Sequence, residues 1–278
     1  MLQVATWFAF IHYDLGVDST YAVESYAEPD AFGKAKDSGT PYHKNKWGRY
    51  LRGLNKPQAR LVDAVDTRIP GSKALLSHVL WDAMRVRVNV SKLVKHGVQR
   101  LSPDIQRIVV NTNIIWETTG ELRTDLGLRQ YRMLERRAGI DALACLTMLL
   151  RKCAGLRDSE EVLAIARSLY HVLLISCTFE PFSLVAPFVY RIYREQIFPI
   201  AGVRLDAIDF AQVADMLGGA AAQILMDNDL RVGSDPRRHI RCMADILRGK
   251  HGADLVATFV PAVFVQGDKG PSWNTGSR

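Results

Sequence analysis

The sequence predicts a mainly α-helical fold, in which a basic N-terminal region is followed by a larger helical bundle. Apolar residues recur at helical spacing through most of the chain, and few segments alternate with the two-residue period of a strand. The chain has 278 residues, of which 48% are hydrophobic and 23% charged, so it has the composition of a globular protein with a sizeable core.

The N-terminal segment, residues 1–14, contains an apolar run that no basic residue precedes. A secretory signal peptide needs a positively charged start and a small-residue cleavage site, so we interpret this run as a first buried helix. No stretch reaches the roughly 20 apolar residues that a membrane span needs. We therefore expect no membrane partner and a cytoplasmic location.

Positive charge is concentrated in one short segment near the N-terminus. The formal net charge of the whole chain is +7, and residues 34–60 alone hold eight lysines and arginines against one aspartate. Residues 1–33 are acidic, whereas residues 138–278 hold fifteen basic and fifteen acidic residues. A basic cluster of this kind is typical of a surface that binds a polyanion, most often nucleic acid.

The basic segment contains the ordered string NKWGRYLRGLNKP over residues 45–57. Gly53 is suited to the left-handed end of a helix, and Pro57 to the start of the next one. Trp47 and Tyr50 lie three residues apart, so one helix face packs on the core. The other face then presents the candidate nucleic-acid-binding residues, which are His43, Lys44, Asn45, Lys46, Arg49, Arg52 and, just beyond it, Lys56.

Residues 43–72 resemble the second half of the helix-turn-helix of the Cro/C1-type (XRE) phage-repressor family. In that family the recognition helix ends in arginine or serine, an aromatic residue, glutamate, any residue and glycine; a proline and another amphipathic helix follow. Here the string over 49–53 reads RYLRG, Pro57 follows, and residues 58–69 have apolar residues at helical spacing. Leu51 stands where the family has glutamate. The Gln-x-x-Leu-Ala-like signature of the family's first helix is not visible, and a longer basic loop over 33–41 stands in its place, so the turn is extended.

The resemblance implies a DNA-binding protein: a transcriptional regulator, or the DNA-binding component of a mobile-element or defence system. A helix over 43–52 would enter the groove, supported by Trp47, Tyr50, Gly53 and Pro57, after a first helix from about 19–32. Its basic residues either read base edges or contact only phosphates. The alternative is a basic surface helix with an aromatic anchor, in a non-catalytic interaction subunit of an assembly that contacts RNA, DNA or an acidic partner without sequence preference.

A domain boundary is expected between about residues 88 and 102, because Ser102 and Pro103 are suited to the N-cap and first position of a new helix. We assign residues 1–95 to the basic nucleic-acid-binding region and 100–265 to a helical interaction or dimerisation domain. Residues 266–278 are assigned to a flexible tail. The partners we expect are double-stranded DNA and a second copy of the chain or a larger complex, because repressor-like modules commonly bind two half-sites as dimers.

Helical patterns dominate the C-terminal half, where Pro181, Pro187 and Pro199 interrupt them. Residues 256–265 have the composition of a strand, but Pro261 makes a strand less favourable there because it has no N–H to donate. The amphipathic segments in this half are 141–153, 158–177, 209–227 and 237–250.

Two further groups of arginines are interpreted as solvated. Residues 123–137 read as a solvated helix face, with a second backbone-contacting patch or pairing with acidic groups of a partner as alternatives. Residues 237–239 read as an exposed helix start.

No catalytic or metal-binding motif occurs in the sequence. Arg167 and His171 have nearly the spacing of an RNase arginine–histidine pair, but we assign them to a core helix. The four cysteines, Cys145, Cys153, Cys177 and Cys242, form no CxxC pair, so we expect reduced thiols without zinc or disulfides. We expect neither enzymatic activity nor a cofactor.

Overall fold

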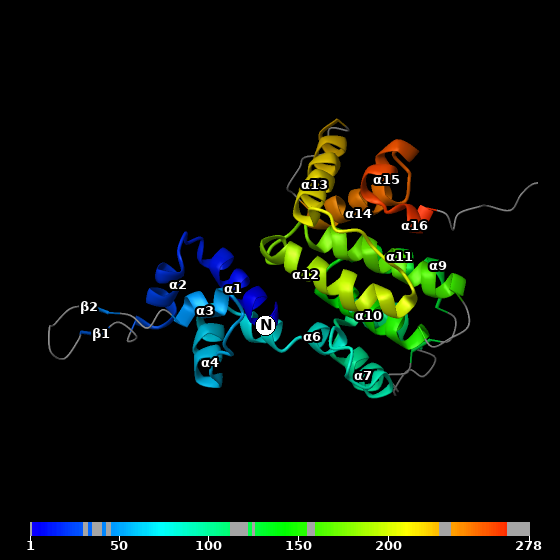
Figure 1. The fold of residues 1–278 in the computed structure, drawn as a ribbon. Coiled ribbons are helices and arrows are strands. Elements are labelled where there is room, and N and C mark those ends of the chain that lie inside the picture. Colours follow the sequence, from blue (N-terminus) through cyan, green and yellow to red (C-terminus); the bar gives the residue numbers. More distant parts are fainter. Residues whose placement is uncertain are drawn as a thin grey trace, which may run out of the picture.

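The protein is mainly helical, as the sequence predicts (Figure 1). Within the described residues, strands are limited to an antiparallel pair, β1 (Gly33–Lys34) and β2 (Pro41–Tyr42). The computed structural model describes residues 2–29, 33–34, 41–42, 46–111, 122–123, 126–154, 159–227 and 235–265.

Buried apolar side chains form two separate clusters. The N-terminal cluster joins α1 (Leu2–Leu15), α2 (Thr20–Ala27), α3 (Lys46–Leu51), α4 (Ala59–Arg68) and α5 (Ser72–Leu76). The larger cluster takes in nearly all the buried apolar residues from Val79 to Phe264. The clusters divide between residues 76 and 79, and α6 (Val79–Ala83) and α7 (Val90–Gly97) pack on the larger one.

The larger cluster surrounds α10 (Ile140–Cys153), in which residues 142–150 are all buried. A helix that is apolar on every side needs neighbours on every side. α10 is covered by α6, α7 and α11, among others. The other helices of this part are α8 (Pro103–Val109), α9 (Leu128–Glu135), α11 (Ser159–Ser176), α12 (Ala186–Ile192), α13 (Phe210–Asp227), α14 (Pro236–Leu247), α15 (Ala253–Phe259) and α16 (Ala262–Val265).

Prolines set several helix boundaries, and one sequence-based expectation is corrected. α8 begins at Pro103 after the N-cap Ser102, as predicted. The strand composition of residues 256–265 is misleading, because this segment forms the end of α15 and then α16. Pro261 disfavours the helical conformation of the residue before it, and Val260 is accordingly extended. Two short helices therefore replace the strand.

α1 belongs to both clusters. Its residues Trp7, Phe8 and Ile11 are buried in the N-terminal cluster, whereas Ala9 is buried in the larger one. α1 also contacts the short helical segment Ser183–Val185 of the larger part. The helix thus lies between the two cores.

A buried guanidinium fixes α6 and the following loop onto α10. Arg151 is 5% exposed, and its two terminal nitrogens donate to the carbonyl oxygens of Ala83 (2.7 Å), Val86 (3.0 Å) and Val88 (2.6 Å). Carbonyl groups at the end of a helix lack partners within the helix, so this contact satisfies them and pairs the guanidinium with acceptors.

A second buried network joins α9, α11 and α14. The Glu135 carboxylate lies 3.1 Å from His171 Nδ1 and accepts from Arg248 Nε (2.5 Å) and a terminal Arg248 nitrogen (2.6 Å). Burial alone would raise the pKa of Glu135, but His171 and Arg248 outweigh it and lower the pKa from 4.5 to about 2. His171 is buried, which agrees with its assignment to a core helix.

We expect Glu135→Gln to reduce the free energy of unfolding at pH 7 by about 3 kcal/mol, because it breaks a buried ion pair. In the native protein, the stabilisation from this carboxylate is complete above its unfolded-state pKa of 4.5 and is lost as the pH falls towards about 2. The variant lacks this part of the acid dependence. Urea unfolding at pH 7, 4.5 and 3 measures both effects.

Glu195→Gln is the control, because Glu195 is exposed and, among the described residues, pairs only with its neighbour Arg194. We expect it to change the free energy of unfolding by less than about 0.5 kcal/mol. Equal effects of the two substitutions would contradict a stabilising role for the buried network.

Candidate nucleic-acid interface

An aromatic cluster anchors α3, the helix that carries the basic string. Trp47 and Tyr50 are buried, as their three-residue spacing predicts. The Trp47 ring stacks on Trp7 of α1 with ring centroids 5.6 Å apart, and Tyr50 meets both indole rings edge-on. Such pairs add about 0.5–1.5 kcal/mol each beyond the area they bury. One face of α3 is therefore fixed against α1.

Glu28, the C-cap residue of α2, ties the start of α3 to the end of α2. One carboxylate oxygen of Glu28 lies 2.5 Å from Lys46 Nζ. The other accepts a hydrogen bond from Trp47 Nε1 at 3.0 Å. The buried indole N–H thus has a charged acceptor. Lys46, predicted as a nucleic-acid contact, is therefore engaged within the protein, and sequence reasoning missed this role.

The end of α3 has the predicted glycine stop. Gly53 has a φ of 64°, its N–H donates to Tyr50 O (2.8 Å), and Leu54 N–H donates to Arg49 O (2.9 Å). This pair of bonds is the Schellman motif, in which glycine takes the left-handed conformation without a steric penalty. Pro57 comes before Gln58, the N-cap of α4, and so precedes that helix rather than occupying its first position.

The remaining candidate residues divide into exposed side chains and positions outside the described residues. Arg49 is exposed on α3, Arg52 is exposed in the turn directly after it, and Lys56 is exposed in the connection to α4. Arg52 Nε donates to Gly48 O at 3.0 Å, which directs its guanidinium along the helix. The helix predicted over 43–52 is described only from Lys46 onwards; His43, Lys44 and Asn45 lie outside the described residues.

The connection between α2 and α3 differs from the turn of the repressor family. Residues 28–45 separate the two helices and include the β1–β2 pair. A helix-turn-helix joins its helices by a turn of about three to four residues. α2 falls inside the expected first helix, residues 19–32, but ends at Ala27.

A second basic surface lies on and around α7. Residues 83–103 contain no acidic residue but hold Arg85, Arg87, Lys92, Lys95 and Arg100. Arg85 and Arg100 pair with Asp82, whereas Arg87, Lys92 and Lys95 are exposed and have no carboxylate partner in the described part of the chain. Sequence analysis missed this surface, which the absence of acidic residues from 83–103 could have indicated.

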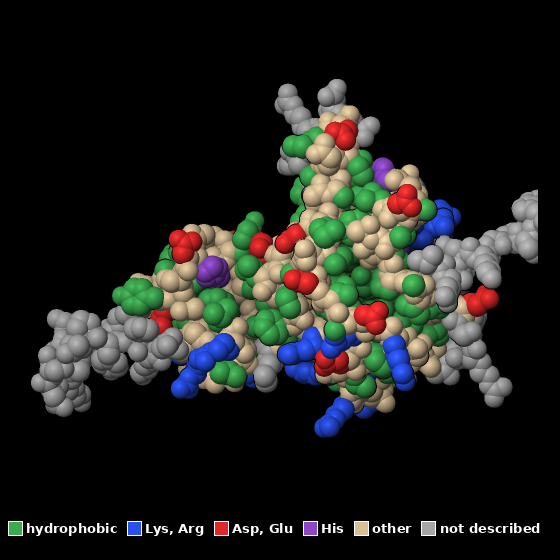
Figure 2. All heavy atoms as spheres, turned by 45° about the horizontal axis from the view of Figure 1, so that its top comes forward, with side chains coloured by type: hydrophobic (Ala, Val, Ile, Leu, Met, Phe, Trp, Pro, Cys, Tyr) green, Lys and Arg blue, Asp and Glu red, His purple; other side chains and the backbone are tan. Residues whose placement is uncertain are grey.

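The two basic surfaces lie on the same side of the molecule. Figure 2 shows Lys and Arg side chains gathered along the lower border of the view, where Figure 1 places α3, α4, α6 and α7. The α3 surface belongs to the N-terminal cluster and the α7 surface to the larger one. An extended polyanion would therefore meet both parts of the chain.

Comparison of the chain with protein-family models, curated protein sequences and solved structures gives no match. No group of three or more His, Cys, Asp or Glu in the described residues is placed to hold a metal ion. None of the described helices is long and apolar enough to cross a bilayer.

All four cysteines are buried free thiols, and burial raises the pKa of Cys145 to about 12.

We expect Glu28→Ala to reduce the free energy of unfolding by about 1–3 kcal/mol, because it leaves the buried Trp47 N–H without its acceptor. Glu28→Gln keeps an acceptor oxygen and should cost less. Thermal and urea unfolding followed by circular dichroism measure the difference.

Asp14→Ala is the matched control, since Asp14 is an exposed acidic residue at the end of α1. It removes the same charge without touching α3. A loss as large as that of Glu28→Ala would attribute the effect to net charge instead of the Trp47 contact.

Proposed function

We propose that the protein binds double-stranded DNA through α3 and the adjoining start of α4, as a transcriptional regulator or as the DNA-binding component of a mobile-element or defence system. The observation that carries the proposal is that Trp47 and Tyr50 fix one face of α3, while Arg49 is exposed on the helix and Arg52 directly after its end. Because the helix backbone is already fixed, binding does not have to order it, and only the arginine side chains lose freedom.

Arg49 is the side chain we propose to read a base. It lies directly before the aromatic residue of the string and has no partner among the described residues that would hold it elsewhere. A guanidinium donates two parallel hydrogen bonds to guanine O6 and N7, the commonest specific contact in the major groove. The exposed residues that follow it in the sequence, Arg52, Lys56 and Arg60, are proposed to contact phosphates.

The α7 surface supports a second, sequence-independent contact with the same duplex. Lys92 and Lys95 are exposed on α7, and Arg87 lies just before it. Because the α3 and α7 surfaces face the same side, one duplex lying across both would gain phosphate contacts from each part of the chain.

Two observations favour the alternative, a non-catalytic subunit that contacts RNA, DNA or an acidic partner without sequence preference. Lys46 is bound to Glu28, and α3 has only six residues. Both reduce the number of side chains that could reach base edges. Self-association of the larger part, which would place two copies on two half-sites, also stays a prediction.

We expect Arg49→Ala to weaken binding to a preferred DNA sequence by about 1–3 kcal/mol and to relax the preference at one base pair, because it removes a bidentate base contact. Selection of bound sequences from a random duplex pool identifies the preferred site. Fluorescence anisotropy titrations then give the affinities for this site and for single-base variants.

Arg129→Ala is the control for charge, because Arg129 is exposed on α9 in the larger part. It should leave the sequence preference unchanged. No DNA binding by the native protein at low salt, or an equal loss in both variants, would refute α3 as the recognition helix. Equal affinity for all duplexes would instead support the alternative.

For the α7 surface, we expect Lys92→Ala combined with Lys95→Ala to weaken binding to all duplexes alike. Each phosphate contact contributes about −0.9 to the slope of log K against log salt, so the slope should become shallower by up to about 2. Titrations at four salt concentrations measure it. An unchanged slope would exclude α7 from the interface.

A further inference from the structure

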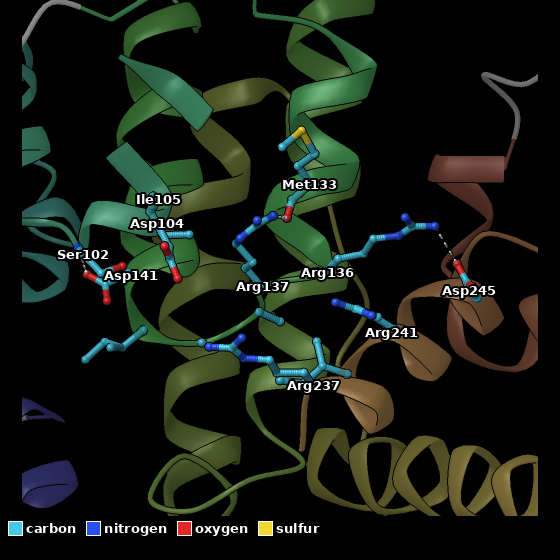
Figure 3. A pocket seen from close by; sticks show the side chains of 14 residues that line it. Ser102, Asp104, Ile105, Met133, Arg136, Arg137, Asp141, Arg237, Arg241 and Asp245 are labelled. Carbon is cyan, nitrogen blue, oxygen red and sulfur yellow. Dashed lines mark hydrogen bonds and ion pairs between the residues drawn. The ribbon is translucent and has the colours of Figure 1, made fainter. Parts of the chain in front are cut away.

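A cavity of about 790 Å³ in the larger part is lined by four arginines from two distant segments. Arg136 and Arg137 lie in the turn that follows α9, and Arg237 and Arg241 lie in the first turns of α14. Figure 3 shows Arg237 and Arg241 of α14 on one side of the hollow and Arg136 and Arg137 on the other, where Arg137 turns toward Met133 and Arg136 toward Asp245. These arginines are exposed, in agreement with the solvated interpretation from the sequence, and the fold in addition brings the two segments to one cavity.

The acidic residues that line the cavity are already bound to donors of the protein. Asp104 pairs with Arg107 at 2.9 Å. Asp141 lies 3.2 Å from His78 Nε2 and accepts from the Ser102 N–H at 3.1 Å.

The third acidic residue, Asp245, lies 3.6 Å from Arg136 and 2.9 Å from Lys250. These carboxylates therefore offset only one of the four arginines directly, Arg136.

Three of the arginines have no carboxylate partner among the described residues. Arg137 donates to the carbonyl oxygen of Met133 at 3.4 Å, and no described acidic side chain pairs with Arg237 or Arg241. Like charges gathered in a concave site raise the local potential and attract anions. Guanidinium forks match the geometry of phosphate oxygens, so phosphate is the anion that suits this group best.

Apolar side chains line the cavity between the arginines. Ile105, Met133, Ile140 and Ile240 supply a surface that inorganic phosphate would not cover. The volume lies within the range of small-molecule sites, about 300–1,000 Å³. A molecule that covered both kinds of surface would combine phosphate groups with an organic body.

We propose that this cavity is a binding site for a small phosphate ester of the nucleotide class. Its phosphates are bound by Arg137, Arg237 and Arg241, and its organic body lies on the isoleucine and methionine side chains. The site lies in the larger part and does not depend on the proposed DNA binding by α3.

The test is isothermal titration of the full chain with ATP, GTP, pyrophosphate and adenosine. We expect at least one nucleotide to bind, pyrophosphate to bind more weakly than that nucleotide, and adenosine not to bind measurably. Arg237→Ala combined with Arg241→Ala should weaken the nucleotide by roughly tenfold or more, since hydrogen bonds to charged groups are lost. Both side chains are exposed, so the variant should keep the circular dichroism spectrum of the native protein.

Arg238→Ala is the matched control, because Arg238 is exposed on the same helix but does not line the cavity. It should retain nucleotide affinity. Binding of neither nucleotide, binding of adenosine as tight as that of the nucleotides, or equal losses in the control would overturn the proposal. The proposal would also be overturned if the native protein did not bind nucleotides and the double variant lost affinity for duplex DNA. The arginines would then belong to a nucleic-acid interface. Failure of DNA binding alone would leave nucleotide affinity unaffected, so the two proposals fail separately.

Discussion

Because α10 is buried along almost its whole length, every helix that covers it must be held at a defined place. Apolar contact alone allows neighbouring helices to slide, whereas a hydrogen-bonded guanidinium has one geometry. Arg151 supplies such a fixed point at the C-terminal side of α10, where it binds carbonyl oxygens at and after the end of α6. The placement of α6 and α7, and with it the basic surface of α7, depends on this contact.

The elements that sequence analysis predicted well are those fixed by local chemistry. The spacing of Trp47 and Tyr50 defined the inward face of α3, Gly53 defined its end, and Pro103 defined the start of α8. Each of these features depends on residues within a few positions of one another. Local stereochemistry and periodicity are sufficient to predict them.

What sequence analysis missed depends on residues far apart in the chain. Glu28 binds Lys46 and Trp47 at the other end of the connection between α2 and α3, and no pattern in the sequence indicates that contact. The arginines near residues 137 and 241 look solvated when each segment is read alone, and only the packing of α9 beside α14 places them around one cavity. In residues 256–265, β-branched composition favoured a strand, but packing on the bundle and Pro261 decided for two short helices.

The position of α1 has a consequence for how the protein unfolds. A helix that contributes side chains to two cores cannot leave one of them without disturbing the other. Domains joined only by a linker unfold independently. When two domains share a helix, loss of that helix lowers the free energy of unfolding of both. During synthesis, α1 therefore gains its full set of contacts only after Ser183–Val185 has been made. The two cores should thus behave in calorimetry as one cooperative unit.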